Sequence, residues 1–100
     1  MGMKSGIVLL ALLLPGLSLA QVAGMPPNGR LLASNCFQCH GTNGKAVSGF
    51  EKLAGMSARE LKEEMAEMKL ENEGDIMGAH AAAYSDAQIA AIAAYFASVR

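Results

Sequence analysis

The residues with the clearest chemical potential are two cysteines and a histidine in the run Cys36-Phe37-Gln38-Cys39-His40. Two thiols three residues apart on one helical turn can each add across one of the two vinyl groups at the edge of a porphyrin. The next residue, His40, can then direct its imidazole at the central iron from the proximal side. A C-x-x-C-H run is the attachment signature of a c-type haem. The spacing therefore predicts one covalent haem c, with Cys36 and Cys39 as thioethers and His40 as the proximal iron ligand.

Three other interpretations of this run remain open from the sequence. A disulfide between Cys36 and Cys39 is chemically possible in an oxidising compartment. A thioredoxin-like redox pair needs a β-α-β context, which the sequence does not offer. A zinc site could combine the side chains of the run with His80, although adjacent ligands in the sequence fit tetrahedral coordination poorly. Haem attachment is favoured because export, a helical pattern and a thin core all agree with it.

A second iron ligand has to come from further along the chain, where the candidates are Met56, Met65, Met68, Met77 and His80. Met65 and Met68 fall on the apolar stripe of an expected helix, where methionine usually fills the core. Met56 follows His40 too closely to cross easily to the opposite face of a haem.

Met77 lies in an expected irregular loop, Asp75–Gly78, between two helices. Such a loop can bring one side chain to the distal iron position. A thioether opposite histidine raises the reduction potential and suits electron transfer better than oxygen chemistry. The sequence therefore favours Met77 as the distal ligand and leaves His80 for a hydrogen bond or a surface charge.

Residues 1–20 have the features of a secretory signal peptide. Lys4 gives a positive start, residues 7–14 are apolar, and Ser18-Leu19-Ala20 offers the small side chains that a signal peptidase requires. The apolar stretch is well short of the roughly 20 residues that span a bilayer. We expect a cleaved signal peptide, a domain over residues 21–100 in the bacterial periplasm and no stable membrane insertion, with an uncleaved anchor as the alternative.

The composition of residues 21–100 restricts the possible partners. Without residues 1–20, the lysine and arginine count falls from 8 to 7 against 9 acidic residues, so the net charge is −2. A nucleic-acid partner held through phosphate contacts is not expected at this charge. The 5 aromatic residues and 2 cysteines give a short chain only a thin core, which usually needs a disulfide, a metal or a cofactor.

The sequence pattern of residues 21–100 predicts helices joined by glycine-containing loops. A short helix over residues 30–35 leads into the cysteine run. Capping boxes at Ser57–Glu60 and Ser85–Gln88 open two longer helices, and residues 72–75 end the first of these. Neither a strand pattern of period two nor an internal repeat is present. The expected fold is all-α, with three to four helices around the haem.

Several runs resemble a class I c-type cytochrome over nearly all of residues 21–100: Cys36–His40, Leu53-Ala54-Gly55, Met77 and the closing run Tyr84–Phe96. The resemblance implies that the first and last helices cross closely, at Gly29, Leu32 and Tyr95. It also implies a backbone carbonyl that accepts the N–H of His40. The family often supplies this carbonyl from a proline, whereas residues 46–50 contain none.

More narrowly, Cys39–Gly44, Ile76–Gly78 and Tyr84–Asp86 are similar to the small cytochrome subunit of flavocytochrome c sulfide dehydrogenase. This resemblance implies an electron-transfer subunit that takes single electrons from a flavoprotein oxidising sulfide to sulfur. With both cysteines used as thioethers, the sequence offers no nucleophile set for independent catalysis. A free soluble carrier between a periplasmic dehydrogenase and a terminal oxidase is the alternative, and a haem sensor or peroxidase with an exchangeable distal ligand is a third.

Overall fold

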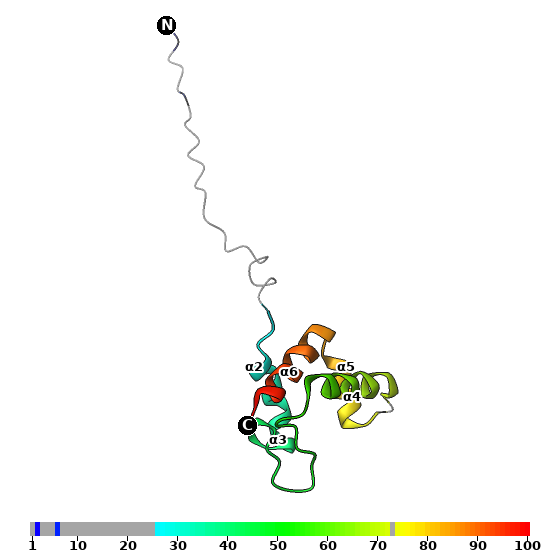
Figure 1. Ribbon diagram of the computed structural model, residues 1–100. Helices are drawn as coiled ribbons and strands as arrows, with labels where there is room; N and C mark the ends of the chain where they lie inside the picture. The colour runs from blue at the N-terminus through cyan, green and yellow to red at the C-terminus, as the bar shows by residue number, and fades with distance from the viewer. Residues whose placement is uncertain (1, 3–5, 7–25, 73) are drawn as a thin grey trace.

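The computed structural model describes Gly2, Gly6, residues 26–72 and residues 74–100. Apart from the two glycines, the predicted signal peptide over residues 1–20 lies outside the described residues. The described chain consists of helices and loops without a strand (Figure 1). This confirms the predicted all-α fold. Every helix in this part of the chain is too short or too polar to cross a membrane.

The first helical segment carries the cysteine run. Its successive elements are α2 (Gly29–Ala33), the 3₁₀ turn η1 (Ser34–Cys36) and α3 (Phe37–His40). The Asn28 side chain caps it by accepting a hydrogen bond from the backbone N–H of Leu31 at 3.0 Å. Cys36 and Cys39 therefore lie one turn apart on nearly continuous helical backbone. A further 3₁₀ turn, η2 (Thr42–Gly44), follows at once.

Three longer helices complete the fold: α4 (Ala58–Glu71), α5 (Ile76–Ala83) and α6 (Asp86–Ser98). The predicted capping box at Ser85 forms completely, whereas only the Ser57 half of the one predicted at Ser57–Glu60 is present. Ser85 Oγ accepts from Gln88 N at 3.2 Å and Ser85 N donates to the Gln88 side chain at 2.9 Å, which completes that capping box. At the start of α4, Ser57 Oγ accepts from Glu60 N at 3.1 Å, while the Glu60 side chain is exposed.

The prediction of an irregular loop at Asp75–Gly78 is wrong. Helix α5 begins at Ile76, because the Asp75 carboxylate accepts a hydrogen bond from Gly78 N at 2.6 Å and caps the first turn. Alanines, which have the highest helix propensity, make up much of the rest of the helix. Met77 is therefore placed by a helix.

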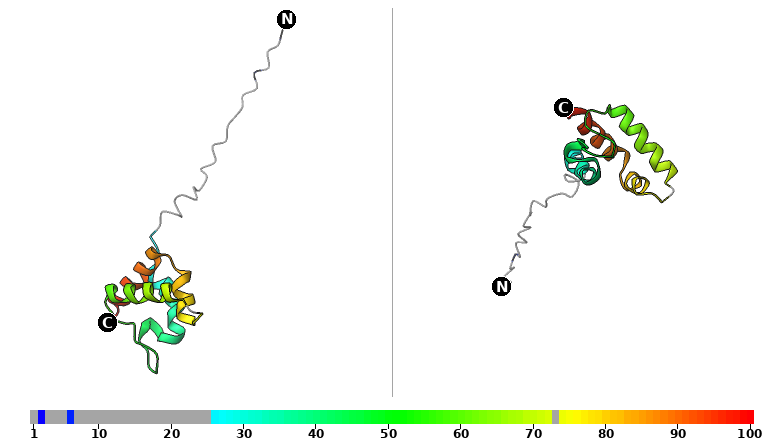
Figure 2. Two further views of the ribbon diagram at one scale, coloured as in Figure 1. Left: turned by 90° about the vertical axis from the view of Figure 1, so that its right-hand side faces the viewer. Right: turned by 90° about the horizontal axis from the view of Figure 1, so that it is seen from below.

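Helix α6 crosses α2 on one side and packs against α4 on the other, and α4 and α5 lie side by side (Figures 1 and 2). Gly29 makes the first crossing possible. A Cβ atom at this position would overlap the carbonyl oxygen of Ala91, would lie 2.9 Å from its carbonyl carbon and would come within 3.3 Å of Tyr95 Cβ. The crossing expected at Gly29 and Tyr95 is confirmed.

The core of the described chain is thin. Phe96 and Ile92 are its largest fully buried side chains, and four of its nine buried apolar residues are alanines. The segment between η2 and α4 extends away from the helices as a loop (Figure 1). Val47, in this loop, is 98% exposed. Small buried side chains and a long loop leave much of the interior to be filled by something else.

Gly29→Ala should destabilise the folded protein by about 1–3 kcal/mol, because the added methyl group forces α2 away from α6. Urea denaturation followed by far-ultraviolet circular dichroism measures this change. Gly49→Ala is the matched control, since a Cβ at Gly49 meets nothing within 4 Å. Equal stabilities of the two variants would contradict the tight crossing.

Candidate cofactor site

A cavity of about 470 Å³ lies between the cysteine run and helices α4, α5 and α6. Protein interiors are close-packed and rarely contain voids larger than a water molecule. A cavity of this volume falls within the about 300–1,000 Å³ typical of ligand and cofactor sites. Its apolar wall consists mainly of Phe50, Leu53, Leu61, Ile76, Ile92 and Phe96. The cavity therefore fits a large, mostly apolar occupant.

All four site residues predicted from the sequence line this cavity. Cys36, Cys39 and His40 belong to the first helical segment, whereas Met77 comes from α5. Cys36 is half-buried and Cys39 is exposed. The structure thus brings the four residues together around one space, with Met77 contributed by a separate element.

His40 is oriented by a backbone carbonyl. Its Nδ1 atom lies 2.6 Å from the carbonyl oxygen of Glu51. A carbonyl can only accept a hydrogen bond, so Nδ1 carries the hydrogen and Nε2 of the neutral ring keeps its lone pair. A hydrogen bond of this kind fixes the tautomer and the orientation of a metal-binding imidazole. The Phe50 ring packs edge-on against the imidazole, with ring centroids 6.2 Å apart.

The loop that supplies this carbonyl is anchored on η2 and α6. The Gly44 carbonyl accepts hydrogen bonds from Leu53 N and Ala54 N at 2.9 and 3.1 Å, and Gly55 N donates to the Phe96 carbonyl at 2.9 Å. Gly44 has a φ of +75°, and a Cβ there would lie 2.7 Å from the Phe96 ring. Glycine at this position thus allows the loop to return close to α6 and present the Glu51 carbonyl to His40.

The other distal candidates occupy different places. Met65, Met68 and His80 also line the cavity, whereas Met56 packs against the core outside the lining residues. Met65 is only 6% exposed and belongs to the buried core cluster, in agreement with its predicted role as core filler. Helix α5 buries only Gly78 and Ala81, so its larger side chains are available to the cavity.

The competing interpretations of the cysteine run gain no support from the geometry. Cys36 and Cys39 are not joined by a disulfide. Burial raises the pKa of the Cys36 thiol, whereas redox-active thiols have a lowered pKa. Among the described residues, no three histidine, cysteine or acidic side chains lie close enough together to bind a metal ion. The side chains considered for a zinc site, those of the cysteine run and His80, all belong to the described residues and form no such group.

The sequence model of the cytochrome c family matches residues 28–100. The chain belongs to the cytochrome c family. A comparison with curated protein sequences finds no match. Membership of the family means that the chain is an electron-transfer haem protein with covalently bound haem c and a redox partner.

The cavity of this cytochrome fits its prosthetic group. Two thiols one helical turn apart, an imidazole with a free Nε2 and an apolar interior are the features that covalent haem attachment needs. The cavity is partly open to solvent, and Cys39 is an exposed residue of its lining.

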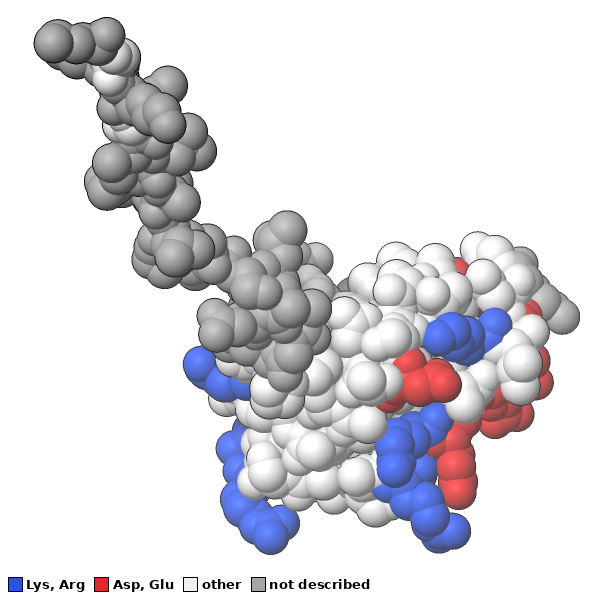
Figure 3. Space-filling model, turned by 90° about the horizontal axis from the view of Figure 1, so that it is seen from above, with Lys and Arg blue, Asp and Glu red and all other residues white. Residues whose placement is uncertain are grey.

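Acidic side chains from α4 and the preceding loop also line the cavity of the cytochrome: Glu51, Glu64, Glu67 and Glu71. Burial raises the pKa of Glu64, and the negative charges of Glu51, Glu60 and Glu67 raise it further. On the face shown in Figure 3, acidic and basic side chains lie next to one another on one part of the surface, beside a large uncharged area.

Several residues of the site were missed from the sequence. Glu51 acts through its backbone carbonyl, so its side-chain type gives no signal. Asn35 lines the cavity, and its Nδ2 atom donates a hydrogen bond to the hydroxyl of Tyr84 at 3.0 Å. Asn35 and Tyr84 are 49 positions apart, and no local pattern could have paired them.

Glu64→Gln should raise the reduction potential of the haem at neutral pH, because a negative charge beside the cavity stabilises the oxidised iron. The pKa of Glu64 is raised above its ordinary value, so Glu64 in the wild-type protein becomes protonated as the pH falls towards this raised pKa. The reduction potential of the wild-type haem should then rise. The difference between variant and wild type should therefore vanish at low pH. Potentiometric titration at several pH values measures this.

Glu63→Gln provides the control for this experiment. Glu63 lies on the exposed side of α4, 3.8 Å from Arg59, and is 66% exposed. Its charge is screened by solvent, so its neutralisation should change the potential less. Equal shifts in the two variants, independent of pH, would contradict a local effect of Glu64.

Proposed function

We propose that the chain is an exported carrier of single electrons in which Cys36 and Cys39 bind the haem as thioethers, His40 is the proximal iron ligand and Met77 is the distal ligand. The observation that carries this proposal is the convergence of all four residues on one apolar cavity. The hydrogen bond from His40 Nδ1 to the Glu51 carbonyl supports it further, because it leaves Nε2 available for iron. The signal peptide predicted over residues 1–20 supports a periplasmic location.

The bound haem supplies reversible one-electron chemistry at its iron. The protein's own residues determine how this chemistry is used. Ligation by both His40 and Met77 would leave no open iron position for oxygen, and much of the cavity wall is apolar. These properties favour electron transfer over a sensor or peroxidase function.

Covalent attachment predicts that the mature protein exceeds the polypeptide mass by one haem and keeps it in acidified acetone. Cys39→Ala should lose one thioether and give a poorly matured protein with little stable fold, because the haem fills most of the interior. Mass spectrometry and haem extraction measure these outcomes. Complete release of haem from the wild-type protein would contradict attachment through the cysteines.

Ligation by Met77 predicts a near-infrared sulfur-to-iron charge-transfer band in the oxidised protein. Met77→Ala should abolish this band, whereas Met65→Ala and Met68→Ala should keep it. The two control methionines also line the cavity, so they match Met77 in environment. Loss of the band in the Met68 variant instead would show that α4 supplies the ligand. Carbon monoxide binding by the reduced wild-type protein would favour the sensor or peroxidase alternative.

The resemblance of Cys39–Gly44, Ile76–Gly78 and Tyr84–Asp86 supports a flavoprotein sulfide dehydrogenase as the electron donor. Hydrosulfide loses two electrons and a proton to become zero-valent sulfur, and a flavin accepts both electrons. The cytochrome then takes them in two one-electron steps and passes each to a downstream oxidant. Gln38 and Cys39 are exposed residues of the cysteine run, and Cys39 also lines the cavity. An edge of the haem could approach the flavin at this place.

Capture of the tagged mature protein from its native host should recover a flavin-containing partner that reduces this haem when sulfide is added. Flavin fluorescence of the eluate and haem absorbance after sulfide addition measure the result. Met77→Ala serves as a control, since it should keep the partner and change the electron transfer. Recovery of the monomer alone, with no sulfide-dependent reduction by any host fraction, would favour the free carrier.

A further inference from the structure

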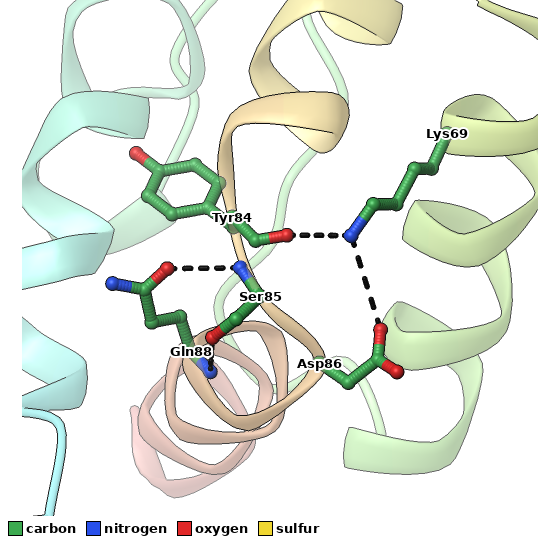
Figure 4. Close-up of polar contacts among 5 residues, drawn as sticks. All are labelled: Lys69, Tyr84, Ser85, Asp86 and Gln88. Atoms are coloured by element: carbon green, nitrogen blue, oxygen red, sulfur yellow. Dashed lines mark hydrogen bonds and ion pairs between the residues drawn. The ribbon is translucent and has the colours of Figure 1, made fainter.

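The corner between α5 and α6 is held by polar contacts on both sides. Tyr84, the C-terminal cap of α5, lies at this corner. Lys69 Nζ, from α4, donates a hydrogen bond to the backbone carbonyl of Tyr84 at 2.6 Å and lies 3.9 Å from the Asp86 carboxylate (Figure 4). On the other side, the hydroxyl of Tyr84 accepts the hydrogen bond from Asn35, the residue before Cys36. Tyr84 therefore connects α4 to the first helical segment.

Of the two contacts that Lys69 makes, the hydrogen bond to the Tyr84 carbonyl stabilises the corner more than the ion pair with Asp86 does. The Lys69 side chain is 35% exposed, whereas the Asp86 side chain is fully exposed, so their ion pair contributes little. The contact joins a charged ammonium donor to a backbone carbonyl, and such a bond is stronger than a hydrogen bond between two neutral groups. The hydrogen bond from Lys69 to the Tyr84 carbonyl is thus favoured both by charge and by its partly buried position.

Helix α5 depends on these contacts more than a well-buried helix would. It has eight residues and buries only Gly78 and Ala81. At its N-terminal end it lies close against the end of α4, where a Cβ on Gly78 would come 3.2 Å from Asn72 Cα. At its C-terminal end, the contacts of Tyr84 hold it. Met77 lies in the first turn of α5, next to the N-terminal attachment at Gly78 and two turns before Tyr84, and it lines the same cavity as Tyr84.

We propose that Lys69 is a positioning residue, which keeps α5 in the place and register that hold Met77 on the iron, with Asn35 fixing the same corner to the haem-binding segment. The proposal rests on the proposed role of Met77 as distal ligand. Release of the corner would let the C-terminal end of α5 swing away from α4 about its N-terminal attachment, and the whole short helix, with Met77 in its first turn, would shift relative to the cavity. An external ligand would then displace Met77 more easily.

The affinity of the oxidised protein for added imidazole measures this release. Lys69→Met keeps most of the unbranched side chain and removes its charge and donors. It should bind imidazole about tenfold more tightly than wild type, as expected for loss of a charged hydrogen bond. Lys69→Arg should restore an affinity near that of wild type. Tyr84→Phe, which removes only the hydroxyl contact with Asn35, should give about a fivefold increase, and it provides a second test if Lys69→Met does not fold.

Two control variants separate this effect from a general loss of stability. Lys62→Met makes the same change on the exposed side of α4 and should leave imidazole affinity unchanged. Asp86→Asn removes the exposed ion pair, keeps the carbonyl contact and should also have little effect. If the near-infrared band is present in the wild-type protein and both Lys69→Met and Tyr84→Phe bind imidazole as weakly as wild type, the positioning role alone is overturned. Absence of the band from wild type would overturn Met77 ligation and the positioning role together.

Discussion

The structure depends on a central cavity that the polypeptide does not fill. A chain with few aromatic residues and a core of small side chains cannot close around a space of about 470 Å³ at the packing density of a normal interior. The covalent haem c of the cytochrome c family supplies the missing apolar volume. The helices therefore act mainly as walls around the haem, and the cofactor is part of the core as well as the redox centre.

The two sides of this cavity are built differently. On the His40 side, η2, the following loop and α6 are joined by several backbone hydrogen bonds, and close contacts at Gly44 leave little freedom. On the Met77 side, α5 is short, buries only two small residues and is held at its ends. The His40 side is therefore the more firmly held of the two, and the Met77 side is the more lightly packed. Motion in such a site is expected where buried apolar contacts are few.

Charge is also distributed unevenly around the cavity. Glutamates of α4 approach the site from one side, and the pKa of Glu64 is raised by burial and by neighbouring carboxylates. The thiol of Cys39 reaches the surface at the cysteine run. The helix that carries most of these glutamates also carries Lys69, so α4 contributes both to the electrostatics and to the geometry of the site.

The sequence by itself determined the all-α class, the start of α4 at Ser57, the start of α6 at Ser85 and the cysteine run. These features depend on residues close together in the chain, where caps, apolar periodicity and ligand spacing can be recognised directly. The close crossing at Gly29 was expected only through the resemblance to class I cytochromes, and the packing of Ala91 against Gly29 confirms it.

Tertiary structure decided what local patterns could not. It identified the Glu51 carbonyl as the partner of His40, because backbone acceptors leave no trace in residue type. It replaced the expected loop at Asp75–Gly78 with the first turn of α5, since the Asp75 cap and the following alanines outweighed the flanking glycines. It also joined Asn35 and Lys69 to Tyr84, at separations of 49 and 15 residues. Contacts of this kind arise only when the helices pack, and they fix where each predicted ligand lies.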